Sequence, residues 1–450
     1  MERNALKQLF LWNDQPVRKP LVLMGARQVG KTWLMNEFAR LKYPSDAVYV
    51  NLMKMKKLRN SIESDDISPE AVLEKIEVAL DVDIVPGKTL LILDEIQESS
   101  NALGSLKFFN EDMPQLAVIA AGSLLGLALG RAKTERKDGE PLNEDRGSFP
   151  VGKVNFLDLR PMSFSEFIRA VGRRKLAEIV ESADMKKVSG FSEELTDLLK
   201  RYFIIGGMPE AINAFLASGD YARVREVQAE ILTAYDIDFV KHAAPSMLAK
   251  IRLLWDSIPA QLAKENKKFI YSALKSGARA REYESALQWL EDAGMLQQVF
   301  RVGTPRLPLK SYRDFSAFKL YVHDVGLLGS MSELSPAILL DGNALFTNFK
   351  GAMTEQYVLQ EMLAAGYDPS YWSNDSGNAE VEFVVQGEQN VYPVEVKAGI
   401  NTQAKSLKVY REIFNPPYAL RTSLAEGHDG EKVKDIPLFA LGTALPGLVR

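Results

Sequence analysis

Short apolar runs alternate with amphipathic stretches through the first third of the chain. The runs have the length of buried strands, and the stretches between them carry apolar residues at helical spacing. The runs span residues 21–24, 47–52, 89–95, 115–123 and 149–154. Strands that alternate with helices are typical of a sheet with crossover helices. The pattern therefore predicts an α/β domain over residues 1–160.

A glycine-bearing loop follows the first apolar run. Residues 25–32, GARQVGKT, fit the pattern G-x-x-x-x-G-K-[ST] between a strand and a helix. Triphosphate oxygens must be met by several backbone N–H groups at once, which such a loop at a helix N-terminus allows. We expect Lys31 to reach the outer phosphates of ATP and the Thr32 hydroxyl to bind Mg²⁺. An ordinary glycine-rich turn is the alternative. The predicted nucleotide-binding residues are Gly25, Ala26, Arg27, Gln28, Val29, Gly30, Lys31, Thr32 and Trp33.

Two later runs end in polar residues that would complete this site. Asp94 and Glu95 follow four apolar residues, and the carboxyl ends of strands face the phosphates in nucleotide-binding sheets. We expect Asp94 to hold Mg²⁺ and Glu95 to orient or activate the attacking water. Ser123 ends the next run. It is placed to sense the terminal phosphate or to hold the water, and a plain turn serine is the alternative. The predicted catalytic residues are Lys31, Glu95 and Ser123.

A polar stretch and then a helical segment follow. Residues 131–146 are charged and nearly free of large apolar residues, so we expect a solvated loop or a functional clamp. Gly206 and Gly207 interrupt the helical segment as a hinge or a tight turn. We expect residues 161–245 to form a helical lid that moves with nucleotide state. Its helices are predicted at 165–169, 187–203 and 221–241.

Residues 246–335 carry a different pattern. Residues 251–265 open this unit, and residues 271–275 lead through a turn at Gly277 to a predicted helix over 279–293. Two predicted strands of a hairpin follow, 295–302 and 318–322. Helix-turn-helix followed by a hairpin is the winged-helix pattern. Such folds contact DNA phosphates or other proteins, and a local basic patch favours DNA. The basic residues are Lys264, Lys267, Lys268, Lys275, Arg279 and Arg281.

The last predicted domain, residues 336–450, gathers acids on a helix and a hairpin. Alternation places Glu395 and Lys397 on one face of a strand. A hairpin can bring Glu382 beside them, and Glu355 lies on the preceding amphipathic helix. Three acids can bind one or two Mg²⁺ and hold a water for attack on a phosphodiester, with the lysine stabilising charge. A charged hairpin face is the alternative.

Composition narrows these interpretations. The 450 residues are 46% hydrophobic and 25% charged, which is typical of a globular protein. With no cysteine and three scattered histidines, disulfides and cysteine-bound or histidine-rich metal sites are not expected. No apolar run reaches the length of a membrane span, and the start lacks a signal-peptide layout. We expect a cytoplasmic protein without a membrane partner. Its net charge of −4 confines any nucleic-acid surface to a local patch.

The order of the motifs resembles a prokaryotic AAA-like ATPase family related to the STAND and archaeal-type ATPases. The resemblance implies a P-loop NTPase sheet with a helical lid, a winged helix, and a restriction-endonuclease-like C-terminal fold of the PD-(D/E)xK type. On that pattern Glu355, Glu382, Glu395 and Lys397 match the helix acid, the strand acids and the lysine. Glu382 stands where Asp is usual, and Lys153 where Arg is usual. The motifs are GARQVGKT, LDEIQ at 93–97, Gly-Ser at 122–123, PMSFSEF at 161–167, GGMPE at 206–210, FKLYVHDVGLL at 318–328 and residues 380–399.

Three functions remain open at this point. The first is an Mg²⁺-dependent ATPase whose helical lid repositions the C-terminal modules on nucleic acid. The second is an ATP-gated DNA nuclease that uses the acids of the last domain. The third is a nucleotide-dependent homo-oligomer in which an inactive nuclease-like fold only docks a partner.

Overall fold

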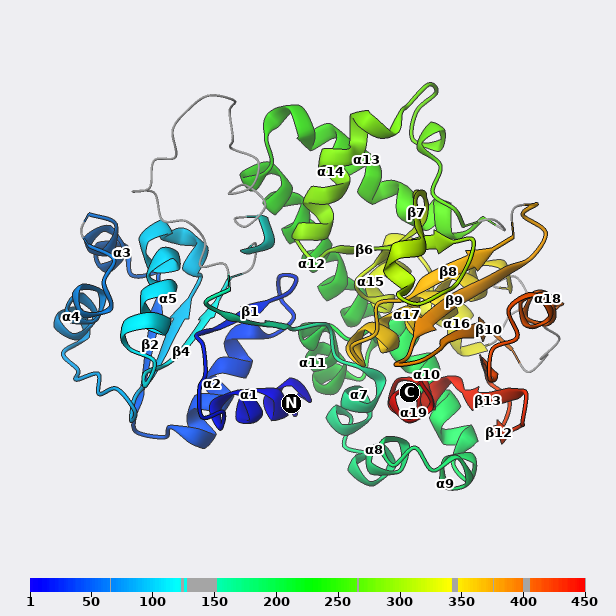
Figure 1. Ribbon diagram of the computed structural model, residues 1–450, viewed down its shortest axis with the longest axis horizontal. Helices are drawn as coiled ribbons and strands as arrows, with labels where there is room; N and C mark the ends of the chain where they lie inside the picture. Colours follow the sequence, from blue (N-terminus) through cyan, green and yellow to red (C-terminus); the bar gives the residue numbers. More distant parts are fainter. Residues whose placement is uncertain are drawn as a thin grey trace. The chain divides into compact units, whose positions relative to one another are not determined.

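The computed structural model divides into two compact units (Figure 1). The smaller comprises Glu2–Arg160 and Asp292–Gly294, and the larger comprises Pro161–Glu291 and Met295–Arg450 together with Met1. The structure describes residues 1–64, 66–122, 125–127, 152–264, 267–341, 347–374, 376–399 and 405–449. The charged stretch 131–146 and Ser123, both singled out from the sequence, lie outside the described residues.

A parallel five-stranded sheet forms the centre of the smaller unit, which confirms the predicted α/β organisation. Its strand order is β2-β3-β4-β1-β5, and every neighbouring pair is parallel. The strands are β1 (Leu21–Met24), β2 (Ala47–Asn51), β3 (Leu90–Asp94), β4 (Ala117–Ala121) and β5 (Asn155–Asp158). The prediction for the last strand was wrong by several residues, because β5 begins only at Asn155, which pairs with Leu21.

Helices pack against this sheet, and one of them was missed. The helices are α1 (Ala5–Asn13), α2 (Lys31–Lys42), α3 (Lys56–Glu63), α4 (Pro69–Leu80) and α5 (Ser100–Asp112). The sequence of residues 54–66 is mostly polar and charged, so no helix was predicted there, yet α3 buries Leu58 and Ile62 in the core of the unit. Only two apolar residues anchor this helix, so its polar residues dominated the sequence pattern.

The larger unit begins with helices. They are α7 (Phe164–Ala170), α8 (Arg174–Glu181), α9 (Met185–Ser189), α10 (Ser192–Ile205), α11 (Pro209–Ser218), α12 (Tyr221–His242) and α13 (Pro245–Leu262). The single helix expected over 187–203 is two, α9 and α10. Helix α7 starts with a capping box, in which the Ser163 and Glu166 side chains each accept from the other's backbone N–H. The Ser and Glu of the sequence PMSFSEF therefore have a structural role at the start of this helix.

A mixed eight-stranded sheet runs through the rest of the larger unit, in the order β12-β13-β11-β10-β9-β8-β6-β7. Its strands are β6 (Leu296–Val302), β7 (Arg313–Val322), β8 (Ser370–Ser373), β9 (Glu380–Gln386), β10 (Val391–Val396), β11 (Ala419–Ser423), β12 (His428–Asp429) and β13 (Val433–Pro437). The β6–β7 hairpin predicted as a wing is antiparallel. Its strand β6 also pairs with β8, so the hairpin is continuous with the C-terminal sheet rather than separate from it.

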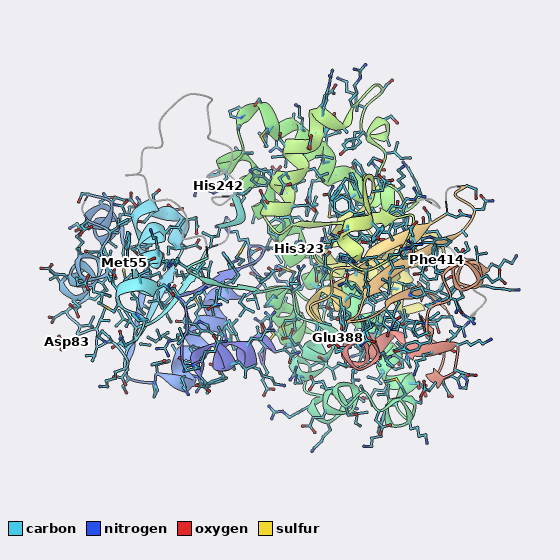
Figure 2. All side chains as sticks on the ribbon, viewed as in Figure 1. Met55, Asp83, His242, His323, Glu388 and Phe414 are labelled. Atoms are coloured by element: carbon cyan, nitrogen blue, oxygen red, sulfur yellow. The ribbon has the colours of Figure 1, made fainter. Side chains whose placement is uncertain are left out.

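The remaining helices of the larger unit precede, connect or follow these strands along the chain. They are α14 (Ala280–Asp292), α15 (Val325–Met331), α16 (Pro336–Asp341), α17 (Thr347–Ala364), α18 (Lys405–Phe414) and α19 (Leu441–Leu448). His323 lies among the packed side chains of this unit (Figure 2), where its Nδ1 is 3.0 Å from the Met295 carbonyl oxygen. Across the described residues, each helix is too short or too polar to cross a bilayer.

The Gly-Gly motif forms a tight turn in the larger unit. The Gly207 N–H donates to Asp324 Oδ2 at 2.6 Å. A Cβ at Gly206, where φ is +75°, would lie 2.2 Å from Asp324 Oδ1. Asp324 also caps α15 by accepting from the Leu327 N–H at 3.0 Å. Such close packing leaves the two glycines little freedom to act as a hinge, so the tight-turn interpretation is favoured.

Glu361 makes the stability of the larger unit depend on pH. Burial raises the pKa of this carboxyl from 4.5 to about 8, and the nearby Glu166 adds to the rise, while the Phe164 N–H opposes it. In the unfolded chain Glu361 ionises at its ordinary pKa. Its stabilising contribution is therefore fully present below pH 4.5 and is lost as pH rises toward 8.

We expect Glu361→Gln to flatten this pH dependence, because an amide mimics the protonated carboxyl and does not ionise. Chemical unfolding of both proteins between pH 5 and pH 8 measures the effect, and the free energy of unfolding of the variant should fall less over this interval. Equal falls in the two proteins would contradict the assignment.

Candidate functional site

The predicted phosphate loop opens α2 without a capping side chain. Gly30, the N-cap residue, has φ +98° and no side-chain cap is present. Gly25 has φ +126° and Gln28 has φ +67°, so the loop winds through left-handed conformations that direct its backbone toward one point. The first N–H groups of an α-helix lack intrahelical partners, and the helix dipole adds positive charge there. This end of α2 is suited to bind an anion.

Lys31 lies buried within this loop. Its Nζ donates to the carbonyl oxygens of Gly25 and Ala26, each at 2.8 Å. Burial lowers the pKa of the ammonium to about 8, although Glu95 and Asp94 act in the opposite direction. Asp158, at the end of β5, opposes the lowering as well. A lysine held at this cost beside a loop of backbone donors is a strong indication of a functional role.

Thr32 and Asp94 meet as predicted. The Thr32 hydroxyl donates to Asp94 Oδ2 at 2.9 Å, and Asp94 is 4% exposed. Tyr49, which the sequence analysis missed, donates its hydroxyl to the same oxygen at 2.6 Å. Burial raises the pKa of Tyr49 to about 12, so this phenol stays a donor. No local sequence pattern points to Tyr49, because it reaches Asp94 through the pairing of β2 with β3.

Glu95 is held in an uncommon backbone conformation. Its φ is +54°, and its Oε2 accepts a hydrogen bond from Gln97 Nε2 at 2.7 Å. A Cβ at Gly122 would lie 2.1 Å from Gln97 Oε1, so the end of β4 closes on the same glutamine. Non-glycine residues with positive φ are often found at functional sites. The remaining predicted contact residue, Trp33, is 40% exposed at the start of α2.

The donor set of this site fits Mg²⁺. A threonine hydroxyl and an aspartate carboxylate, 2.9 Å apart, are the hard oxygen ligands that this cation prefers. Both lie at the end of the loop where an anion would bind. Thr32 and Asp94 are therefore the residues that would hold the ion.

Glu355, by contrast, is surrounded by protein partners in the larger unit. Its Oε1 pairs with Lys267 Nζ, and its Oε2 accepts from the Tyr321 hydroxyl at 3.1 Å. Lys319 Nζ lies 3.8 Å from Oε2. Burial opposes ionisation, yet Lys267 and Lys319 outweigh it and lower the pKa of Glu355. This carboxylate is already neutralised by two lysines, so it does not fit a metal ligand in this arrangement.

The other three predicted residues come from neighbouring strands: Glu382 lies on β9, Glu395 lies on β10, and Lys397 directly follows β10. Lys397 Nζ is 2.5 Å from Glu395 Oε1, and Glu382 Oε2 accepts from the Val396 N–H at 3.0 Å. Burial, Glu395 and Glu355 raise the pKa of Glu382 to about 8. Glu395 is 2% exposed, and its Oε2 has no hydrogen-bond partner among the described residues. Within those residues, no three His, Asp or Glu side chains are grouped so as to hold a metal ion.

The residues of the predicted basic patch differ in exposure and pairing. Lys267 is paired with Glu355, which removes it from the basic patch, whereas the other five residues of the patch are exposed. In the smaller unit, Lys153 pairs with Glu111 at 2.8 Å. The charge of Lys153 is therefore partly compensated by this ion pair at the protein surface.

Three parts of the chain match family models, and only the first of these families has a descriptive name. Residues 17–168 match the family model described as AAA domain. Residues 196–337 match a domain of unknown function, DUF8612, and residues 350–440 match another, DUF4143. A search of curated proteins finds no match.

Two solved structures are similar to this chain only at low sequence identity and low TM-score. The Walker-type ATPase PABY2304 of Pyrococcus abyssi is 15% identical, with a TM-score of 0.44 over 73% of this chain and 95% of that chain. The Aeropyrum pernix ORC1 protein, solved in complex with DNA, is 14% identical, with a TM-score of 0.30 over 74% and 93%. In sequence, residues 17–168 are thus similar to a AAA domain.

Replacing Lys31 should stabilise the protein. The cost of burying this cation is fully present below pH 8 and disappears as pH rises toward 10.5, the ordinary pKa. We expect Lys31→Met to raise the free energy of unfolding at pH 7 by about 2 kcal/mol, after the loss of two hydrogen bonds is included. Lys42→Met, which removes an exposed ion pair from the same helix, should change it by less than about 0.5 kcal/mol. Destabilisation by Lys31→Met would show that the lysine is structural.

Proposed function

We propose that the chain binds and hydrolyses ATP and that its nucleotide state controls the larger unit. The observation that carries the proposal is the desolvated Lys31 at the uncapped start of α2, beside the Thr32–Asp94 contact. A carbonyl-bound ammonium can exchange its partners for phosphate oxygens without entering water. The match of residues 17–168 to the AAA domain supports the same chemistry.

Each residue of the site has a role in this proposal. The loop N–H groups of residues 25–33 hold the phosphates, and Lys31 compensates charge on the outer ones. Mg²⁺, bound by Thr32 and Asp94, would neutralise charge that develops on the transferred phosphoryl group. Glu95 orients the attacking water and accepts its proton. Gln97, which donates to Glu95, fixes the carboxylate that has to face this water.

Two variants separate binding from hydrolysis. Lys31→Ala should reduce ATP turnover to below about 1% of the parental rate, because charge on the outer phosphates is no longer compensated. Glu95→Gln should bind the nucleotide within about threefold of the parental affinity but hydrolyse it at least about 100-fold more slowly, since the amide cannot accept a proton. A fluorescent ATP analogue and phosphate release measure the two quantities. Parental turnover in Lys31→Ala would remove the proposal.

The larger unit is the proposed output of this ATPase. Five exposed basic residues between positions 264 and 281 support nucleic-acid phosphates as its ligand. The division of this unit into a helical lid, a winged helix and a nuclease-like domain remains a prediction. Nucleotide-dependent self-association, with this unit as a docking module, is the remaining interpretation from the sequence.

Metal-dependent DNA cleavage by the larger unit is a second candidate function. The observation that favours it is the buried Glu395 Oε2, which has no hydrogen-bond partner within the part of the chain that the structure describes and lies near Lys397 and Glu382. The pairing of Glu355 with Lys267 weighs against a complete metal site, and we derive no cleavage step from this arrangement.

One experiment distinguishes these outputs. We expect duplex DNA to raise ATP turnover about fivefold without being cut, because lysines neutralise Glu355 while five basic residues lie exposed on the larger unit. Turnover and plasmid nicking are measured together with Mg²⁺ or Mn²⁺, with single-stranded DNA and RNA as alternative ligands. Nicking that is lost in Glu395→Gln would establish the nuclease. No response to any nucleic acid, together with nucleotide-dependent light scattering, would establish the oligomer.

A further inference from the structure

Residues 159–164, which we call the connector, link the smaller unit to the larger one. The first residues of the connector pack against the start of the phosphate loop. The Leu159 N–H donates to the Met24 carbonyl oxygen at 2.9 Å. A Cβ at Gly25 would lie 2.1 Å from the Leu159 carbonyl oxygen. The first glycine of the phosphate loop is therefore required for this approach as well as for its own φ of +126°.

Arg3 joins the phosphate loop to the connector a second time. Its side chain is buried, with the residue 7% exposed. Nη1 donates to the Val29 carbonyl oxygen at 2.8 Å, and Nη2 donates to the Arg160 carbonyl oxygen at 2.6 Å. A planar guanidinium presents its donors in a fixed fork, so one rigid group sets the separation of these two carbonyls.

The other end of the connector is fixed within the larger unit. The Met162 N–H donates to the Gly207 carbonyl oxygen at 2.7 Å, and the Met162 carbonyl oxygen accepts from the Tyr202 hydroxyl. A Cβ at Gly207 would lie 2.2 Å from that same carbonyl oxygen. The Phe164 N–H donates to Glu361 Oε1 on α17 at 2.8 Å. The connector thus cannot shift without disturbing α10, the Gly-Gly turn or α17.

We propose that Arg3 is a positioning residue that couples the phosphate loop to the larger unit through the connector. The inference rests on the proposed nucleotide site and names how its state is passed on. A nucleotide that changes the loop at Gly25 or Val29 must displace Leu159 and Arg160, because close-packed contacts do not yield continuously. The displacement reaches Met162 and the turn at Gly207 through the backbone itself.

Hydrogen exchange of the full chain tests this coupling, with Mg²⁺ and the non-hydrolysable analogue AMP-PNP as the probe. In the parental protein the nucleotide should slow exchange in peptides covering 21–34 and also in peptides covering 161–170 and 200–212, by about fivefold or more. In Arg3→Lys, which keeps the charge but loses the fork, protection of 21–34 should remain. Protection of the other two segments should fall to less than half of the parental change.

Two further variants make the result specific. Tyr202→Phe removes the hydroxyl that holds Met162 and leaves the phosphate loop untouched, so it should lose the distant protection with unchanged nucleotide affinity. Arg18→Ala is the matched control, because Arg18 donates to the carbonyl oxygens of Asn13 and Gln115 and contacts neither loop nor connector in these bonds. It should respond like the parental protein.

The outcomes separate the inference from the proposed function. Distant protection that persists in Arg3→Lys and Tyr202→Phe at equal nucleotide occupancy would overturn the coupling alone, as would a parental protein protected only at 21–34. Absence of protection at 21–34 in the parental protein would overturn the nucleotide site and the coupling with it.

Discussion

The charge of Lys31, held away from water at the start of α2, is the constraint on which the smaller unit depends. An isolated ammonium in such a place would be costly, and the protein offsets the cost with two loop carbonyls and the charges of three acids. These acids, Asp94, Glu95 and Asp158, lie at or just after the ends of two strands. The carboxyl ends of parallel strands meet at one edge of the sheet. The parallel fold is therefore what places these acids beside the lysine of the loop.

Local patterns explain why this part was predictable. Residues 21–34 combine a strand, a glycine-bearing loop and a helix start within a few turns of chain, so neighbouring residues determine the outcome. Tyr49 and Asp158 could not be found in this way. Each takes part through its strand's position in the sheet order, β2 next to β3 and β5 next to β1, which no local pattern contains. The helix α3 was missed for a related reason, since its two buried residues contact a core assembled from distant segments.

The larger unit shows the same limit more strongly. The acids of the last segment were recognised on their helix and strands, but their partners were not. Lys267 reaches Glu355 across 88 positions of the chain, and Lys319 and Tyr321 come from a strand assigned to a different module. An acid whose counter-ions come from afar looks unpaired in the sequence. One continuous sheet runs from β7 to β12. The sequence therefore predicted individual helices and strands better than it predicted which of them belong to the same domain.

This grouping changes how an ATPase could act on the rest of the chain. The helices after residue 160 belong to the same compact unit as the C-terminal sheet, and the Gly-Gly turn within them is closed by Asp324. A helical segment that shares one compact unit with this sheet would carry the sheet with it when it moves. The backbone between Arg160 and Pro161 then becomes the covalent route for any nucleotide-driven change. The close packing of Gly25 on one side and Gly207 on the other gives that route its stiffness, because compact contacts transmit displacement whereas loose ones absorb it.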